Sequence, residues 1–206
     1  MSNNILKRCE MKSVSCLFLL FLTQLPSNQS GVPDYFPLTV GNEWTYKMPG
    51  ATEDNEQTIR VAEYSDEYRA YLVRTIFRIG GAFPITSEDL IERRKNKVLL
   101  LGSRGGLLGT DWNFTSGLLM QLPLQPKSNW KQGDDRKTEY SVVGFAALTV
   151  AAGTFENVCK IKKVVKRFHI QYFMYFAPNV GLIKEEVINE DNTTSTFREL
   201  TSWKFN

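Results

Sequence analysis

The residues that most often carry catalytic chemistry are few and isolated in this sequence of 206 residues. His169 is the single histidine, so a Ser-His-Asp triad could use only this side chain, and no G-x-S-x-G motif marks a nucleophilic serine. A zinc site needs about four ligands, yet Cys159 is the one cysteine outside residues 1–30. Calcium loops place oxygen ligands in a D-x-D-x-D-G order that the chain lacks. The sequence therefore predicts no catalytic residue, no metal site, no cofactor and no enzymatic activity.

Carboxylates leave one enzymatic alternative open. Glycoside hydrolases use two carboxyl groups about 5 to 9.5 Å apart across the bond that they cleave. Asp34, Glu43, Asp111 and Glu139 could supply such groups, but no spacing in the sequence pairs them. An exported hydrolase with an unrecognised carboxylate site is thus an alternative that rests on analogy with other exported β-rich proteins.

A glycine-rich stretch at residues 102–109, GSRGGLLG, superficially resembles a phosphate-binding loop. It lacks the G-x-x-x-x-G-K-[ST] pattern, and no helical pattern follows it. We predict a flexible surface loop instead. Because glycine frees the backbone, Gly105 and Gly106 are candidate lid residues for any ligand or partner that the protein binds.

Aromatic side chains are dense between residues 168 and 176, and they suggest a binding surface. A concave sheet lined by aromatic residues could hold a lipid or an acyl chain. We therefore take Phe168, Tyr172 and Tyr175, together with Gly105 and Gly106, as the candidate surface for a ligand or a protein partner. The alternative is a closed hydrophobic core that binds nothing.

The same region carries a basic cluster, whose members are Lys160, Lys162, Lys163, Lys166 and Arg167, and an acidic segment follows at residues 185–191. Pairing between neighbouring strands explains both. Contact with an anionic lipid or polymer is the alternative.

The elements that would position these residues are predicted to be β-strands. Period-two alternation of β-branched and aromatic residues indicates strands at 43–47, 58–64, 68–79, 88–93, 97–101, 138–150, 155–168, 169–176, 180–189 and 194–205. The one stretch with a helical tendency is a turn at residues 118–122. The fold class is therefore mainly β: a single domain of antiparallel strands forming a curved sheet, a sandwich or an open barrel, with little helix beyond the N-terminal leader.

Residues 1–30 have the order of a signal peptide. Basic residues come first, an apolar run follows at residues 14–22, and a small polar stretch ends the segment. The run is too short for a bilayer, which needs about 20 apolar residues, so no transmembrane helix is expected once the leader is removed. The domain organisation is thus a signal peptide at 1–30 and one β-rich envelope domain at 31–206.

Charge and cysteine content agree with this division. The chain has 25 basic and 22 acidic residues, of which three and one lie in the leader, so residues 31–206 carry a net charge of +1. A nearly neutral domain has no field that would attract nucleic acid. Cys159 alone cannot form an intramolecular disulfide, and its apolar neighbours indicate a buried, inert thiol.

Three segments carry a resemblance that spans most of the domain. These are residues 35–46 (YFPLTVGNEWTY), 152–158 (AGTFENV) and 175–184 (YFAPNVGLIK). They resemble an uncharacterised family of bacterial exported, lipoprotein-like proteins with an FPLxVGNxWxY opening and an APxVGLIKxE segment. The resemblance implies a β-rich fold in the periplasm, outer envelope or extracellular space, and it brings no catalytic residues. No lipid-attachment cysteine follows the leader, so the resemblance supports export but not lipid attachment.

The sequence thus predicts an exported cell-envelope protein of non-enzymatic type that binds an apolar ligand or a protein partner. Membrane contact is compatible with this prediction. The exported hydrolase and a purely structural surface protein remain as alternatives.

Overall fold

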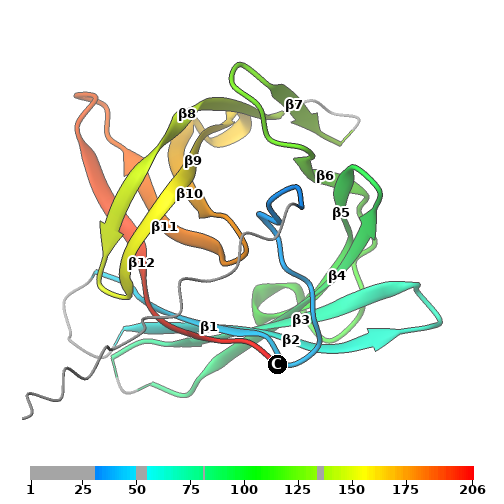
Figure 1. Ribbon diagram of the computed structural model, residues 1–206. Helices are drawn as coiled ribbons and strands as arrows, with labels where there is room; N and C mark the ends of the chain where they lie inside the picture. The colour runs from blue at the N-terminus through cyan, green and yellow to red at the C-terminus, as the bar shows by residue number, and fades with distance from the viewer. Residues whose placement is uncertain (1–30, 50–54, 81, 134–136) are drawn as a thin grey trace, which may run out of the picture. The chain divides into compact units, whose positions relative to one another are not determined.

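The computed structural model describes residues 31–49, 55–80, 82–133 and 137–206 (Figure 1). The signal peptide predicted at residues 1–30 lies outside the described residues. Among the residues that the structure describes, no helix is long and apolar enough to cross a membrane.

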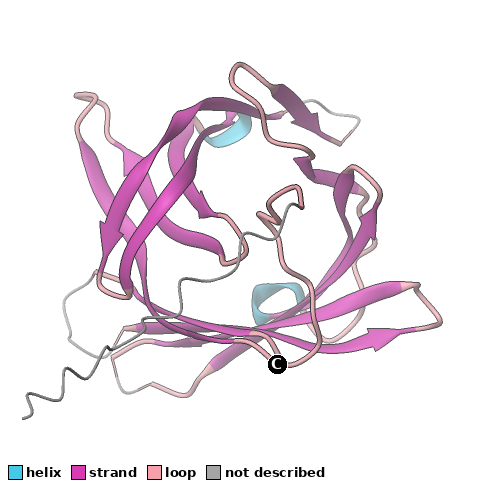
Figure 2. Ribbon diagram, in the orientation of Figure 1, coloured by secondary structure: helices cyan, strands magenta, loops and turns pink. Residues whose placement is uncertain are grey.

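Strands make up nearly all of the regular structure, as Figure 2 shows, with two short 3₁₀ turns beside them. The strands are β1 (Glu43–Lys47), β2 (Glu56–Ser65), β3 (Ala70–Arg78), β4 (Ile85–Arg94), β5 (Lys97–Gly105), β6 (Gly117–Gln121), β7 (Asn129–Gln132), β8 (Thr138–Val150), β9 (Gly153–Val165), β10 (Ile170–Ala177), β11 (Gly181–Ile188) and β12 (Thr194–Lys204). The 3₁₀ turns are η1 (Gly106–Leu108) and η2 (Lys166–Phe168). The prediction of a mainly β fold is confirmed.

All twelve strands belong to one antiparallel sheet in the order β6-β5-β4-β3-β2-β1-β12-β11-β10-β9-β8-β7. Neighbours in the sheet are neighbours in the sequence, except that β1 pairs with β12 and so joins the two halves of the chain. The strands β6 and β7 form the two edges, although they follow one another along the chain.

The sheet curls until these two edges approach each other. The indole Nε1 of Trp130 on β7 donates a hydrogen bond of 3.2 Å to the carbonyl oxygen of Leu119 on β6. The Trp130 ring also stacks on Tyr140 of β8, with 5.2 Å between the ring centroids. Of the shapes expected from the sequence, the open barrel is therefore the one that forms.

The main core lies inside the curled sheet. Fully buried aliphatic side chains converge there from strands across the whole sheet, among them Val61, Val98, Ile161, Ile183 and Leu200. The segment before β1 adds Tyr35 and Leu38 to this core, and Figure 1 shows this segment running inside the outline of the strands.

The alternation of β3 illustrates why the sheet has two different faces. Val73 and Thr75 are buried towards the interior, whereas Arg74 between them forms an ion pair with Glu88 on the opposite face. Successive side chains of a strand point to opposite faces, and β3 therefore shows the period-two alternation from which a strand at 68–79 is predicted. On the outer face, Leu72 belongs to a second small cluster that includes Tyr68 and Trp112.

Two expectations about local structure are wrong. Residues 118–122 do not form a helical turn, because residues 117–121 are the edge strand β6. The glycine-rich stretch is not wholly a loop either, since Gly102 to Gly105 complete β5. A Cβ at Gly102 would lie 3.1 Å from the Phe114 ring, so this glycine permits close packing rather than motion.

A second strand, besides β6, was not predicted. The strand β7, Asn129–Gln132, is short and polar apart from Trp130, and it therefore shows no alternation that could be recognised in the sequence.

Candidate functional site

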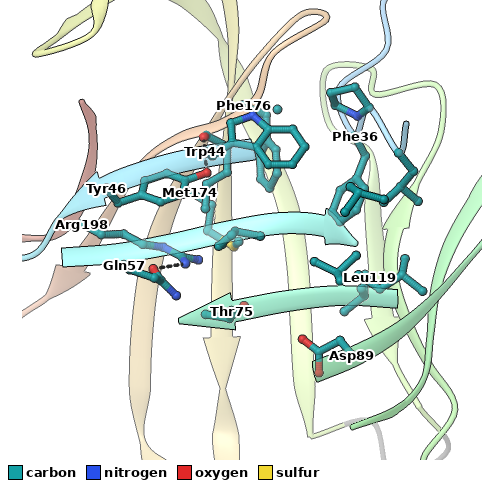
Figure 3. Close-up of a pocket in the computed structure, with 18 of the residues that line it drawn as sticks. Phe36, Trp44, Tyr46, Gln57, Thr75, Asp89, Leu119, Met174, Phe176 and Arg198 are labelled. Atoms are coloured by element: carbon teal, nitrogen blue, oxygen red, sulfur yellow. Dashed lines mark hydrogen bonds between the residues drawn. The ribbon is translucent and has the colours of Figure 1, made fainter. Parts of the chain in front are cut away.

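A cavity of about 340 Å³ lies inside the curled sheet. Its volume falls in the range of about 300 to 1,000 Å³ that is usual for small-molecule sites. The cavity is lined by side chains from eight strands and from the segment before β1: Phe36, Pro37, Leu38, Trp44, Tyr46, Gln57, Ile59, Val61, Val73, Thr75, Phe77, Ser87, Asp89, Ile91, Leu119, Met174, Phe176, Gly181, Leu182 and Arg198. Figure 3 shows most of these side chains converging on one space.

One wall of the cavity is apolar and aromatic. Trp44, Phe176 and Phe36 lie along this wall (Figure 3). The indole Nε1 of Trp44 donates to the carbonyl oxygen of Val180 at 2.6 Å, so the ring is fixed and its polar atom is already satisfied. The wall therefore offers a ligand mainly ring surface.

The opposite wall carries a strip of polar side chains. Gln57 of β2, Thr75 of β3 and Asp89 of β4 follow one another across adjacent strands, and Arg198 of β12 extends the strip beyond β1. Thr75 lies opposite Ser87 in the sheet, and Asp89 lies opposite Val73, so the strip runs diagonally over the strands. Figure 3 shows Arg198, Gln57, Thr75 and Asp89 in this order along one side of the cavity.

The guanidinium group of Arg198 is held by three neighbours. Its Nη2 lies 2.8 Å from Oε2 of Glu185, its Nη1 donates to Oε1 of Gln57 at 2.7 Å, and its centre lies 5.3 Å from the ring centroid of Tyr46. The side chain of Arg198 is 15 % exposed and that of Glu185 is 5 % exposed. The Nε–H of Arg198 is buried and has no hydrogen-bond partner among the described residues.

Two further ionisable groups face the interior. Asp89 accepts a hydrogen bond from Oγ of Ser103, and burial nevertheless raises the pKa of the Asp89 carboxyl above its usual value. Lys163 lines an adjoining hollow of about 120 Å³ that shares Phe36 and Met174 with the main cavity. Burial lowers the pKa of Lys163, while the nearby Glu185 acts in the opposite direction.

The structure does not bring the predicted binding residues together as one site. Phe168 is exposed in η2, and Gly105 lines a separate hollow on the outer face with Arg74, Glu88 and Arg104. Gly106 follows Gly105 at the end of β5. None of these residues lines the central cavity.

The two tyrosines of the predicted surface also separate. The Tyr175 hydroxyl donates to Oε2 of Glu186 at 2.6 Å, whereas the Tyr172 ring lies 5.2 Å from the Lys163 ammonium group. Met174 and Phe176, which lie on β10 with the two tyrosines, line the cavity instead.

The carboxylates of the hydrolase alternative lie on separate elements and do not line the cavity. Asp34 forms an ion pair with Arg93 at 2.7 Å, and Glu139 forms ion pairs with Lys131 and Lys166. Glu43 begins β1, and Asp111 is exposed in the loop after η1.

His169 is also exposed and adopts a left-handed backbone conformation at the end of η2. In the described part of the chain, no group of three or more His, Cys, Asp or Glu residues could hold a metal ion.

Sequence reasoning missed the polar strip because its members come from distant parts of the chain. Gln57, Asp89 and Arg198 look like ordinary solvent-facing strand residues in isolation. The one available signal was the alternation in β10, which places Met174 and Phe176 on the same face.

Two solved structures share this fold. One is a candidate exported protein with a YmcC-like fold from Bacteroides fragilis, with 13% identity and a TM-score of 0.55. The other is a candidate lipoprotein from Parabacteroides distasonis, with 15% identity and a TM-score of 0.55. Each comparison covers 84% of this chain and 100% of the other. No protein-family model matches the chain, and no curated protein sequence matches it.

Proposed function

We propose that this chain is an exported, non-enzymatic protein of the bacterial cell envelope that holds an apolar ligand inside its curled sheet. The observation that carries the proposal is the central cavity, whose walls are mostly aliphatic and aromatic. Such a space, with a few polar groups on one side, is the usual form of a small-molecule site. The leader-like order of residues 1–30 and the exported or lipoprotein character ascribed to the two structural neighbours support export.

Ligand binding is tested with delipidated protein and N-phenyl-1-naphthylamine, an uncharged probe that fluoresces in apolar surroundings. We expect saturable fluorescence enhancement, and native mass spectrometry of protein that has not been delipidated should show a co-purified small molecule. In an Ile59→Trp variant the larger side chain should fill part of the cavity and reduce probe binding by about tenfold or more, equivalent to about 1.4 kcal/mol.

The matched control is Ile85→Trp, because Ile85 is exposed and does not line the cavity. Circular dichroism should confirm that both variants fold. If wild-type protein binds no probe and carries no small molecule, the proposal is wrong.

A protein-binding role is the second candidate, and exposed apolar side chains favour it. Phe83, between β3 and β4, is 96 % exposed, and Phe168, between β9 and β10, is 62 % exposed. The antiparallel order places both turns at the same end of the sheet, together with the fully exposed Leu107 of η1. Two results together would favour this role over ligand binding. The purified protein would bind no probe and carry no small molecule, and cross-links to a partner formed in cells would disappear in a Phe83→Ser/Leu107→Ser variant.

Export itself has a direct measurement. The full-length chain is expressed with a C-terminal tag in a bacterial host, and the tagged protein is recovered from the envelope fraction. Its intact mass should correspond to loss of a segment of about 15–30 residues. Recovery of the uncleaved chain from the cytoplasm would contradict export.

A further inference from the structure

We propose that the ligand of the central cavity is an uncharged amphiphile, with hydroxyl, ester or amide groups along one edge, and that the cavity discriminates against fatty-acid anions. This inference rests on the proposed function and gives it a ligand class. It follows from the charges and hydrogen-bonding groups that face the interior.

The charges of the cavity wall leave no cation available for an anionic ligand. Arg198 and Asp89 are the charged side chains among the described residues that line the cavity. Glu185 already compensates Arg198 at 2.8 Å. A carboxylate entering this space would gain no free positive charge and would lie near the carboxyl group of Asp89, which is unfavourable at low dielectric.

Lys163 is the cation through which an anion could still be recognised. It lines the adjoining hollow rather than the main cavity, and the ring of Tyr172 lies 5.2 Å from its ammonium group. Burial disfavours its charged form. Among the described residues that line the two spaces or pair with their lining, Lys163 and Arg198 are matched in number by Asp89 and Glu185, which suits a neutral ligand.

One donor of the polar strip nevertheless lacks a hydrogen-bond partner among the described residues. This donor is the buried Nε–H of Arg198, and a buried donor without an acceptor is destabilising. Thr75, between Gln57 and Asp89 in the strip, and Ser87, opposite Thr75 on β4, add hydroxyl groups to the cavity lining. A ligand with an acceptor near Arg198 and a hydroxyl near Asp89 would satisfy both ends of the strip.

The aromatic wall, across the cavity from the polar strip, indicates what the rest of the ligand is like. The indole Nε1 of Trp44 is already satisfied by the carbonyl oxygen of Val180. The Trp44 ring, with Phe36 and Phe176, therefore presents apolar surface. A molecule that is apolar on one side and carries neutral polar groups on the other matches both walls.

The test compares ligands of equal chain length at about pH 8, where a fatty acid is ionised. Dodecanol, monododecanoylglycerol and dodecanoate compete against bound N-phenyl-1-naphthylamine. We expect the two neutral compounds to displace the probe at concentrations at least about tenfold lower than dodecanoate, a difference of about 1.4 kcal/mol. Displacement by dodecanoate at equal or lower concentrations would overturn the inference while leaving ligand binding intact. Absence of probe binding would instead remove the proposed function.

Variants identify the groups responsible. Asp89→Asn removes the negative charge at nearly constant shape and should raise the affinity for dodecanoate relative to that for monododecanoylglycerol several-fold. Asp66→Asn, in the exposed turn between β2 and β3, is the matched control and should change neither ligand. An unchanged ratio in Asp89→Asn, or strong dodecanoate binding that Lys163→Met abolishes, would count against the inference.

Discussion

At the scale of single residues, the interior of this sheet is unusual for the charge that it contains. Arg198 and Glu185 lie among apolar side chains and satisfy one another at 2.8 Å, with Gln57 as a further acceptor. Removing two charges from water is costly, and the pair recovers that cost only while both partners are present. A gain in stability therefore does not explain why these charged side chains lie in the interior.

This reasoning predicts how the pair responds to substitution. Arg198→Met should lower the free energy of unfolding by about 3–5 kcal/mol, because it leaves the buried Glu185 carboxylate without its cation. The double variant Glu185→Leu/Arg198→Met should regain most of that loss. Urea denaturation of both variants measures the effect, and a loss below about 1 kcal/mol in the single variant would contradict it.

A second residue-scale prediction concerns Cys159. The thiol is buried as the sequence suggests, and burial raises its pKa to about 12. In the unfolded chain the pKa is about 8.5. Between these values the unfolded state loses a proton that the native state keeps, so stability falls as the pH rises, by up to about 1.4 kcal/mol per pH unit.

The control is Cys159→Ala, which lacks this group. Its stability should change less than that of the wild type between about pH 9 and pH 10, although it starts lower because a cavity is created. Tyr46 and Tyr140, whose pKa values burial also raises, contribute equally to both proteins at higher pH. Parallel stability curves for the two proteins would show that the thiol titrates alike in the folded and unfolded chains.

At the scale of elements, the strands follow from local pattern and the turns from backbone chemistry. The strands β1 and β8 begin and end at the residues that alternation predicts. Asn179, in the turn before β11, has a φ of 61°, a left-handed conformation that asparagine adopts more readily than most residues. The edge strands β6 and β7 could not be recognised, because both are short and neither alternates: β6 has three consecutive apolar residues, and β7 is polar apart from Trp130.

The end of β5 provides a test of why its glycines are present. Gly105 has a φ of 82°, and a Cβ there would lie 2.5 Å from the carbonyl oxygen of Thr86 in β4. Gly105→Ala should therefore force the hairpin of β4 and β5 apart and lower stability by about 2–4 kcal/mol. In thermal denaturation the melting temperature should fall well below that of the wild type.

Gly106→Ala is the matched control for this change. Gly106 also has a positive φ, of 56°, but a Cβ at this position would have the Ile85 side chain as its nearest neighbour, at 3.7 Å. Its cost should be limited to backbone strain of about 1 kcal/mol. Equal losses in the two variants would mean that the close approach of β4 does not determine the choice of glycine.

At the scale of the whole molecule, the central cavity exists only because the sheet curls. Gln57, Asp89 and Arg198 face one space although up to 141 residues separate them, as the hydrogen bond between Arg198 and Gln57 shows. Each strand could be inferred from its own sequence, but the pairing of β1 with β12 depends on which distant strands meet. This is why the fold class was predictable while the cavity and its polar strip were not.

Closure of the sheet depends on Trp130, and this dependence can be measured. Trp130→Phe keeps most of the ring surface but removes the hydrogen bond to the Leu119 carbonyl, so the free energy of unfolding should fall by about 0.5–1.5 kcal/mol. Because this bond joins the two edge strands, hydrogen exchange should accelerate first at the backbone amides of β6 and β7. Trp203→Phe changes an exposed tryptophan on β12 and should leave exchange in both edges unaltered. If the Trp130 variant instead speeds exchange evenly across β2 and β3, the edges are held by the sheet as a whole. If the acceleration is confined to β6 and β7, the Trp130 indole holds the two edges together.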